Sequence, residues 1–343
     1  MRDFTEVHTA EGYEIRRYQS GDEASILECH AAVFGPMFPD RPPRTLPWWK
    51  WQYLDNPSGQ RIWVAARETD GAIHAQYAST PCRVRLEGRD AMFAQITDSM
   101  RHPDAAGTHT PSLFLRTAWP LFNDCGGPEA DVMMFGVPTY AHFRLGHRFL
   151  KYEIVRTESA LYLPGHRMDG ALAALPALEV VETDRVGPEA TALYERVADQ
   201  WGASIVRDES ALNWRYADHP GHDYTFGVVP DGSGGVRALA VIRHGDWMVP
   251  NMTLMVDWIC PDDDDEAGLS LARWLVERAR SQQSDVVGGW LPEWCRWFDR
   301  LQDFGWLVGP TNYFMVGRHF HKRVVMDWLK QNWFYTLGDT DQV

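Results

Sequence analysis

This sequence has few cysteines, no long hydrophobic run and no excess of positive charge. The five cysteines are odd in number, widely spaced and form no C-x-x-C pair, as is typical of reduced thiols in the cytosol rather than of disulfides or a zinc site. No apolar run approaches the roughly 18 residues of a membrane span, and residues 1–15 are mixed and charged, unlike a signal peptide. A net charge of −14 disfavours a broad surface for nucleic acid or anionic membrane, because such surfaces cluster Lys and Arg. We therefore expect a soluble, cytoplasmic protein with neither nucleic acid nor membrane as a partner.

What the sequence does contain is an internal repeat. Residues 51–57 and 214–220 both read W-x-Y-x-D-x-P. Each copy is followed by an apolar run that carries an aspartate, Asp98 and then Asp257. A second apolar run, ending in proline, follows in both halves, and all three landmarks repeat at an offset of about 160 residues. With 343 residues, of which 45% are hydrophobic, the chain has room for two domains with a core each.

The hydrophobic periodicity predicts the same order of elements in both halves. In the first half this order is β-α-α-β-β-β-loop-α-β-α-β, which indicates an α/β (α+β) fold with a mixed sheet and helices on both of its faces. Residues 165–176 are rich in Ala and Gly and show no pattern, so we interpret them as a linker. The predicted domains are then residues 1–164 and residues 177–343.

Three segments resemble a known family. Residues 98–104, followed by a glycine-containing loop and a helix, resemble the fourth strand and phosphate loop of the GNAT acyltransferase superfamily. Residues 135–138 and 143–149 are similar to the fifth strand of that fold, its next helix and the "L-G-F" ending. A weaker resemblance covers the second half, including residues 304–306. The resemblance implies two tandem GNAT-like domains and acyl transfer from a CoA thioester to an amine.

The resemblance also implies how the donor, acetyl-CoA, is held. In that fold the backbone N–H groups of the loop and of the helix start bind the pyrophosphate. The residues of this sequence that match are Met100, Arg101, His102, Gly107, Thr108, His109 and Thr110. Gly107 keeps the first glycine of the usual Q/R-x-x-G-x-G/A loop, whereas His109 replaces the second, where a side chain obstructs close approach of the backbone to phosphate.

The second half departs further from the family pattern. Residues 261–266 read P-D-D-D-D-E where the pyrophosphate is expected, and like charges there repel a polyanion. We infer that only the N-terminal domain binds the donor, and that the C-terminal domain shapes the acceptor pocket and stabilises the first. The acidic run and the pair His319 and His321 could hold a cation, but no third ligand is in sight and we predict no metal.

Amine acylation needs a base for the amine and a proton donor for the leaving thiolate. The resemblance implies a carboxylate near the fourth strand as the base, and Asp98 is the candidate. Asp257 matches it in the half predicted to be inactive, so a structural role for the aspartate is an equal alternative. Counting four residues back from Gly146 of the L-G-F ending reaches His142, with Tyr140 nearby, and either could protonate the thiolate. The two W-x-Y-x-D-x-P copies are interpreted as architectural.

The sequence thus predicts an N-acyltransferase that uses acyl-CoA, by default acetyl-CoA, and acts on a small or medium-sized amine. Two alternatives stay open. One is a Fem-type transferase that takes an aminoacyl group from tRNA, and the other is a non-catalytic binding protein of tandem GNAT fold. The expected oligomeric state is a monomer or a homodimer.

Overall fold

In the computed structural model the chain folds into two compact units. The structure describes residues 9–10, 12–39, 41–105, 112–322 and 324–342. Unit 1 comprises Met1–Cys82, Ala91–Glu153 and Val316–Val325, and unit 2 comprises Arg83–Asp90, Ile154–Met315 and Met326–Val343. Each unit therefore contains segments from both halves of the sequence.

Unit 1 is built mainly from the first half of the sequence. Its elements are β1 (Thr9–Ala10), β2 (Tyr13–Arg17), α1 (Glu23–Phe34), α2 (Leu46–Tyr53), β3 (Arg61–Arg67), most of β4 (Ile73–Leu86) and β5 (Arg89–Arg101), α3 (Leu113–Cys125), β6 (Asp131–Gly136), α4 (Tyr140–Leu150) and the end of β14 (Leu307–His319). The strand order is β1-β2-β3-β4-β5-β6-β14, with β5 and β6 parallel.

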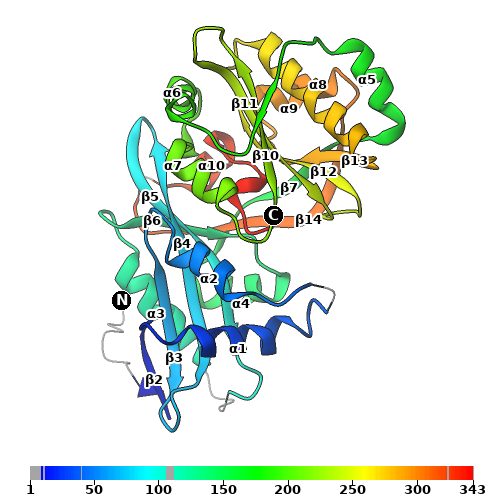
Figure 1. Cartoon of the computed structure of the whole chain (residues 1–343). Helices are drawn as coiled ribbons and strands as arrows, with labels where there is room; N and C mark the ends of the chain where they lie inside the picture. The colour runs from blue at the N-terminus through cyan, green and yellow to red at the C-terminus, as the bar shows by residue number, and fades with distance from the viewer. Residues whose placement is uncertain (1–8, 11, 40, 106–111, 323, 343) are drawn as a thin grey trace. The chain divides into compact units, whose positions relative to one another are not determined.

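Helices cover both faces of the sheet in unit 1 (Figure 1). On one face Ile26 of α1, together with Trp49 and Tyr53 of α2, packs into a core with Met100 of β5. On the other face Tyr77 of β4 contacts two phenylalanines of α3, with ring centroids 5.2 and 5.4 Å apart. The sheet is thus the middle layer of three.

Unit 2 is built mainly from the second half. Its helices are α5 (Met168–Ala174), α6 (Pro188–Val197), α7 (Glu209–Leu212), α8 (Asp265–Ser281), α9 (Arg296–Gln302) and α10 (Met326–Asn332), with short helical turns η1 (Gly165–Arg167), η2 (Ala198–Gln200), η3 (Asn213–Ala217) and η4 (Leu337–Asp339). Its strands are most of β7 (Glu153–Pro164), β8 (Val181–Thr183), β9 (Ala203–Ile205), β10 (Tyr224–Pro230), β11 (Val236–Gly245), β12 (Met252–Ile259), β13 (Val286–Gly289), the first part of β14, and β15 (Trp333–Phe334).

The sheet of unit 2 runs in the order β14-β7-β13-β12-β11-β10-β8, with β12 and β13 parallel. Phe226 of β10 packs against Tyr216 on one face, whereas the neighbouring Gly227 lies against Trp274 of α8 on the other. Unit 2 therefore repeats the three layers of unit 1.

The two halves of the sequence exchange a strand. Strand β7 follows the last helix of the first half, yet it pairs antiparallel with β13 in unit 2. Residues 316–319 of β14, from the second half, pair antiparallel with β6 in unit 1. Each unit is completed by a strand from the other half of the sequence.

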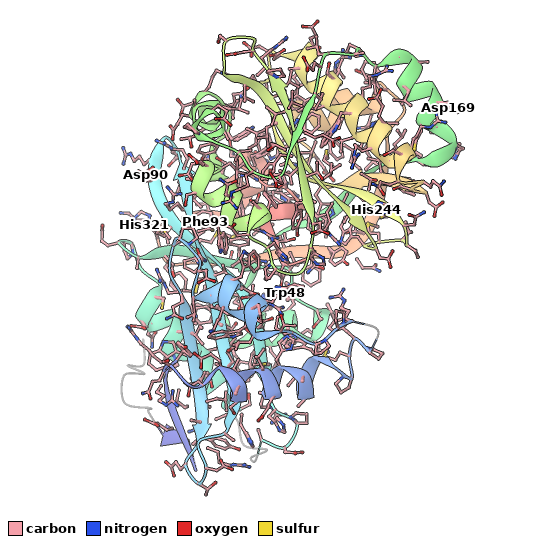
Figure 2. The ribbon with its side chains drawn as sticks, viewed as in Figure 1. Trp48, Asp90, Phe93, Asp169, His244 and His321 are labelled. Atoms are coloured by element: carbon pink, nitrogen blue, oxygen red, sulfur yellow. The ribbon has the colours of Figure 1, made fainter. Side chains whose placement is uncertain are left out.

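The long hairpin of β4 and β5 contributes to both units. Its turn is formed by Glu87 and Gly88, whose φ angles of 50° and 71° suit the tight turns that join twisted strands. Residues 84–86 near this turn pair antiparallel with β9 in unit 2. Asp90, labelled in Figure 2, follows the turn.

The structure confirms the predicted mixed α/β fold with helices on both faces of the sheet. Most of the segment that we interpreted as a linker, residues 165–174, is helical, as η1 and α5. Helix α5 packs on α8, so tertiary contact rather than local pattern holds it. Among the described residues, no helix combines the length and the apolar composition needed to cross a membrane.

Candidate functional site

In unit 1 the parallel strands β5 and β6 stop pairing before β5 ends. Their pairing runs from Met92 opposite Asp131 to Gln95 opposite Phe135, although β5 continues to Arg101. The strands are still close at Gly136, the last residue of β6, where a Cβ would lie 3.2 Å from the carbonyl oxygen of Ile96. Because β6 ends there, the main chain of residues 97–101 is not paired with it. Backbone groups of β5 are thus left for other hydrogen bonds.

Two helices begin beside this part of the sheet. Phe114, in the first turn of α3, and His142, in the first turn of α4, have ring centroids 5.9 Å apart. Thr139 caps α4, since its hydroxyl oxygen accepts a hydrogen bond from the backbone N–H of His142 at 3.4 Å. Helix starts present free backbone N–H groups and a positive dipole end, which together favour anions.

The two residues predicted to protonate the thiolate, His142 and Tyr140, lie in different environments. Burial lowers the pKa of His142, and its Nδ1 lies 3.0 Å from the hydroxyl of Thr139. Tyr140 is 68% exposed, and its ring centroid lies 6.4 Å from that of Phe143. His142 is therefore the more enclosed of the two groups.

Asp98 is surrounded by partners that keep it ionised. Its carboxylate, whose side chain is 8% exposed, accepts hydrogen bonds from Arg44 at 3.2 Å and from the hydroxyl of Tyr53 at 3.1 Å, and lies 3.6 Å from His30 Nε2. Burial raises the pKa of Asp98, but Arg44, His30 and Tyr53 together outweigh it and lower the pKa to about 2. A catalytic base works best with a pKa near the working pH, so this environment suits a structural anchor better than a base.

Unit 2 contains the same arrangement around Asp257. The hydroxyl of Tyr216 donates to one carboxylate oxygen at 2.9 Å, and Arg207 donates to the other at 2.9 Å. In both copies of W-x-Y-x-D-x-P, then, the tyrosine holds the aspartate of a central strand. The arrangement supports the architectural interpretation of the motif.

The sequence analysis missed the arginines of these two clusters, although the repeat contains a signal for them. Arg44 precedes Tyr53 by nine residues and Arg207 precedes Tyr216 by nine (53 − 44 = 216 − 207 = 9). The residue after each arginine caps the next helix, Thr45 in the first copy and Asp208 in the second. The repeated unit is therefore longer than the seven-residue motif and begins at the arginine.

The predicted donor-binding residues differ in their accessibility. The side chain of Met100 is 1% exposed within the core, so only its main chain could contact a ligand, whereas Arg101 is exposed. The ring of His102 stacks on that of His74 with centroids 4.8 Å apart, and its Nδ1 accepts a hydrogen bond from the backbone N–H of Asp104. The remaining predicted residues, Gly107, Thr108, His109 and Thr110, lie outside the described residues.

In unit 2 the start of α8, which matches the start of α3 in unit 1, is filled by side chains of the protein itself. Asp264 caps α8 by accepting from the backbone N–H of Ala267 at 3.2 Å, and it forms an ion pair with Arg237 at 2.7 Å. The indole of Trp297 lies against α8 so closely that a Cβ on Gly268 would be 1.9 Å from it. Because this helix start already has its anion, it offers little to a phosphate.

One further titratable group stands out in unit 2. Burial raises the pKa of Glu158 on β7 to about 7. Its Oε2 accepts a hydrogen bond from the hydroxyl of Tyr335, while its Oε1 is buried and has no hydrogen-bond partner in the described part of the chain. No sequence pattern marked it, because a single glutamate in a strand carries no spacing signal.

The pair of histidines that the sequence singled out is not gathered into a metal site. His319 Nε2 lies 3.7 Å from a carboxylate oxygen of Glu153. Over the described ranges, no three His, Cys, Asp or Glu side chains are grouped as metal ligands would be.

Comparison with known proteins gives the fold. No family model matches this sequence, and no curated protein does. Solved structures do match over most of the chain. One is a conserved protein of unknown function from Enterococcus faecalis V583, called a "Probable N-Acyltransferase", with a TM-score of 0.63 and 12% identity, covering 93% of this chain and 74% of that one.

Two further matches carry an activity in their names. A GCN5-related N-acetyltransferase from Anabaena variabilis has a TM-score of 0.61 and 12% identity, covering 90% of this chain and 73% of that one. The N-myristoyltransferase of Saccharomyces cerevisiae, with bound myristoyl-CoA, has a TM-score of 0.57 and 10% identity, covering 91% and 83%. These similarities confirm the predicted resemblance to the GNAT superfamily at the level of the fold.

Proposed function

We propose that this protein is an N-acyltransferase that takes its acyl group from acyl-CoA, binds that donor in unit 1 and acts on a small or medium-sized amine. The observation that carries the proposal is the end of pairing between β5 and β6 at Gln95 and Phe135, next to the starts of α3 and α4. An unpaired strand edge suits the amide groups of pantetheine, and a helix start suits the pyrophosphate. The GNAT fold of the chain supports the same reading.

In this proposal the residues of unit 1 have separate roles. The main chain of Met100 and the side chains of Arg101 and His102 contact the donor, together with Gly107, Thr108, His109 and Thr110. Asp98 positions the bend of β5, at which its own φ is 45°, rather than acting as the base. His142 gives a proton to the departing sulfur, and Tyr140 is the alternative donor.

The reaction itself is a simple exchange at the thioester carbonyl. The amine nitrogen attacks the carbonyl carbon and forms the C–N bond, the C–S bond breaks, and the electron pair leaves with the sulfur. The proton lost by the nitrogen is balanced by the one that the CoA thiolate gains. A positioned acid or base contributes about 10²- to 10⁴-fold to such a transfer.

Acetyl-CoA is the proposed donor, but one matching structure, the yeast N-myristoyltransferase, holds myristoyl-CoA. Release of free CoA thiol from acetyl-, octanoyl- and myristoyl-CoA, measured with a mixture of amines, tests both activity and chain length. Amine-dependent release supports the function. Its absence with every donor and amine, together with binding of charged tRNA, would favour the Fem-type alternative, and absence of both would favour a binding protein.

A further inference from the structure

A buried arginine of unit 2 forms no ion pair with any residue that the structure describes. Arg243, near the end of β11, is 8% exposed, and His244, the next residue, is labelled in Figure 2. Its Nε is buried and has no hydrogen-bond partner among the described residues. Its guanidinium makes one long hydrogen bond, 3.5 Å, to the carbonyl oxygen of Asp246, and no carboxylate in the described ranges lies within 4.0 Å of it. Buried charges in proteins are normally paired, so this one requires an explanation.

A second unsatisfied donor lies directly across the strand pair. Tyr224 of β10 is opposite Arg243 in the antiparallel register, where side chains point to the same face of the sheet. Tyr224 is 7% exposed, and its hydroxyl is buried without a hydrogen-bond partner in the described part of the chain. A guanidinium edge and a phenol O–H are thus both free to donate at one place.

Arg215 adds a second positive charge near this pair, while Asp223 and Asp246 add negative charge. Burial, together with the charges of Arg243 and Arg215, lowers the pKa of His222 to about 4. The pKa of Arg243 is itself lowered, first by burial and then by Arg215, while Tyr224 and Asp246 oppose the shift. The Asp246 carboxylate accepts a hydrogen bond from the backbone N–H of Asn251 at 2.9 Å and forms no ion pair with Arg243 among the described residues. An anion between these groups would relieve their mutual repulsion.

The guanidinium also lies next to an exposed turn. A Cβ on Gly245 would be 2.9 Å from Arg243 Nη1, so the glycine leaves the room that the guanidinium occupies. Gly245 ends β11, and the turn that follows contains Met248 and Val249, which are 40% and 43% exposed. The Nη1 end of the guanidinium is therefore close to the surface of the molecule.

We propose that Arg243 and Tyr224 form a binding site for the carboxylate of a small organic ligand. A guanidinium donates two parallel hydrogen bonds to a carboxylate, and the phenol supplies a third donor to the same group.

The binding experiment uses benzoate, its neutral analogue benzamide, and inorganic phosphate. Titration calorimetry on the full chain should show saturable binding of benzoate, and affinity at least tenfold weaker for benzamide and for phosphate. Arg243→Met and Tyr224→Phe should each weaken the binding of benzoate. The loss of affinity in Arg243→Met should be about ten- to a hundredfold, as expected for a charged hydrogen-bonding partner. Arg237→Gln is the control, because Arg237 lies on the same strand but is paired with Asp264 and Glu266. Equal affinity for benzoate in the wild type and in Arg243→Met, or preference for phosphate, would overturn the carboxylate site.

Stability separates a binding role from a structural one. Without ligand, Arg243→Met should unfold at the same temperature as the wild type or higher, because the substitution removes an unpaired buried charge. A clear loss of stability would show that Arg243 is a structural residue. When Arg243→Met unfolds at the temperature of the wild type or higher, loss of benzoate binding in it is not the result of unfolding.

Discussion

The hydroxyl of Tyr53 donates a hydrogen bond of 3.1 Å to the carboxylate of Asp98. The second copy repeats it, with Tyr216 donating to Asp257 at 2.9 Å. A contact kept in both halves of a duplicated chain, one of which has an obstructed helix start, serves the architecture common to both. This relationship is the reason to treat Asp98 as an anchor of β5.

Loss of the Asp98 charge should destabilise unit 1. The pKa of about 2 in the folded protein, against an ordinary value of 3.8, corresponds to about 2 kcal/mol, and Asp98→Asn should lose about that much unfolding free energy at pH 7. Urea denaturation of the two proteins measures the difference. Asp70→Asn is a control, because its carboxylate pairs with Arg67 at the surface. An unchanged free energy together with a rate reduced a thousandfold would restore Asp98 as the base.

The lowered pKa of Asp98 also predicts how the stability of the protein changes at acid pH. Since the folded pKa of Asp98 is lowered, its contribution is complete above pH 3.8 and is lost as the pH falls towards 2. The stability difference between the wild type and Asp98→Asn should therefore shrink over this window. A difference that stays constant down to pH 2 would mean that the ion pair with Arg44 does not set the pKa.

The raised pKa of Glu158 predicts that, near neutral pH, stability falls as the pH rises. Its folded pKa of about 7 lies above the ordinary 4.5, so the folded state holds the proton more tightly and stability falls as the pH rises from 4.5 to 7. Glu158→Gln has no carboxyl group that can ionise at this position. Over that window its free energy of unfolding should therefore rise relative to that of the wild type, by up to about 3 kcal/mol. Thermal unfolding at several pH values measures the gain. Glu277→Gln, at an exposed ion pair with Arg273, should show no such trend.

His142 and Tyr140 are distinguished by kinetics. His142→Ala should lower amine-dependent thiol release at least tenfold while leaving the affinity for the donor almost unchanged, as expected for a proton donor. Tyr140→Phe keeps the ring and removes the hydroxyl, and with Tyr140 68% exposed its rate should remain close to that of the wild type. The reverse pattern would assign the proton to Tyr140.

The sequence predicted the duplication, the sheet with its helices, and the GNAT resemblance, because these rest on local periodicity and on motifs within short segments. It could not assign β7 and the end of β14 to their units, since periodicity identifies a strand but not the sheet that receives it. It also missed Tyr224 and Arg243, which are nineteen positions apart (243 − 224 = 19) and meet only through the register of β10 and β11. The anchoring role of Asp98 depends on Arg44 and His30, which come from separate elements.

The most direct test of the account is a crystal structure of the protein with bound CoA. We predict the pantetheine along residues 97–101 of β5 and the pyrophosphate at the start of α3, with α8 of unit 2 empty of nucleotide. A nucleotide seated beside Asp264 at the start of α8 would contradict the assignment of the donor to unit 1.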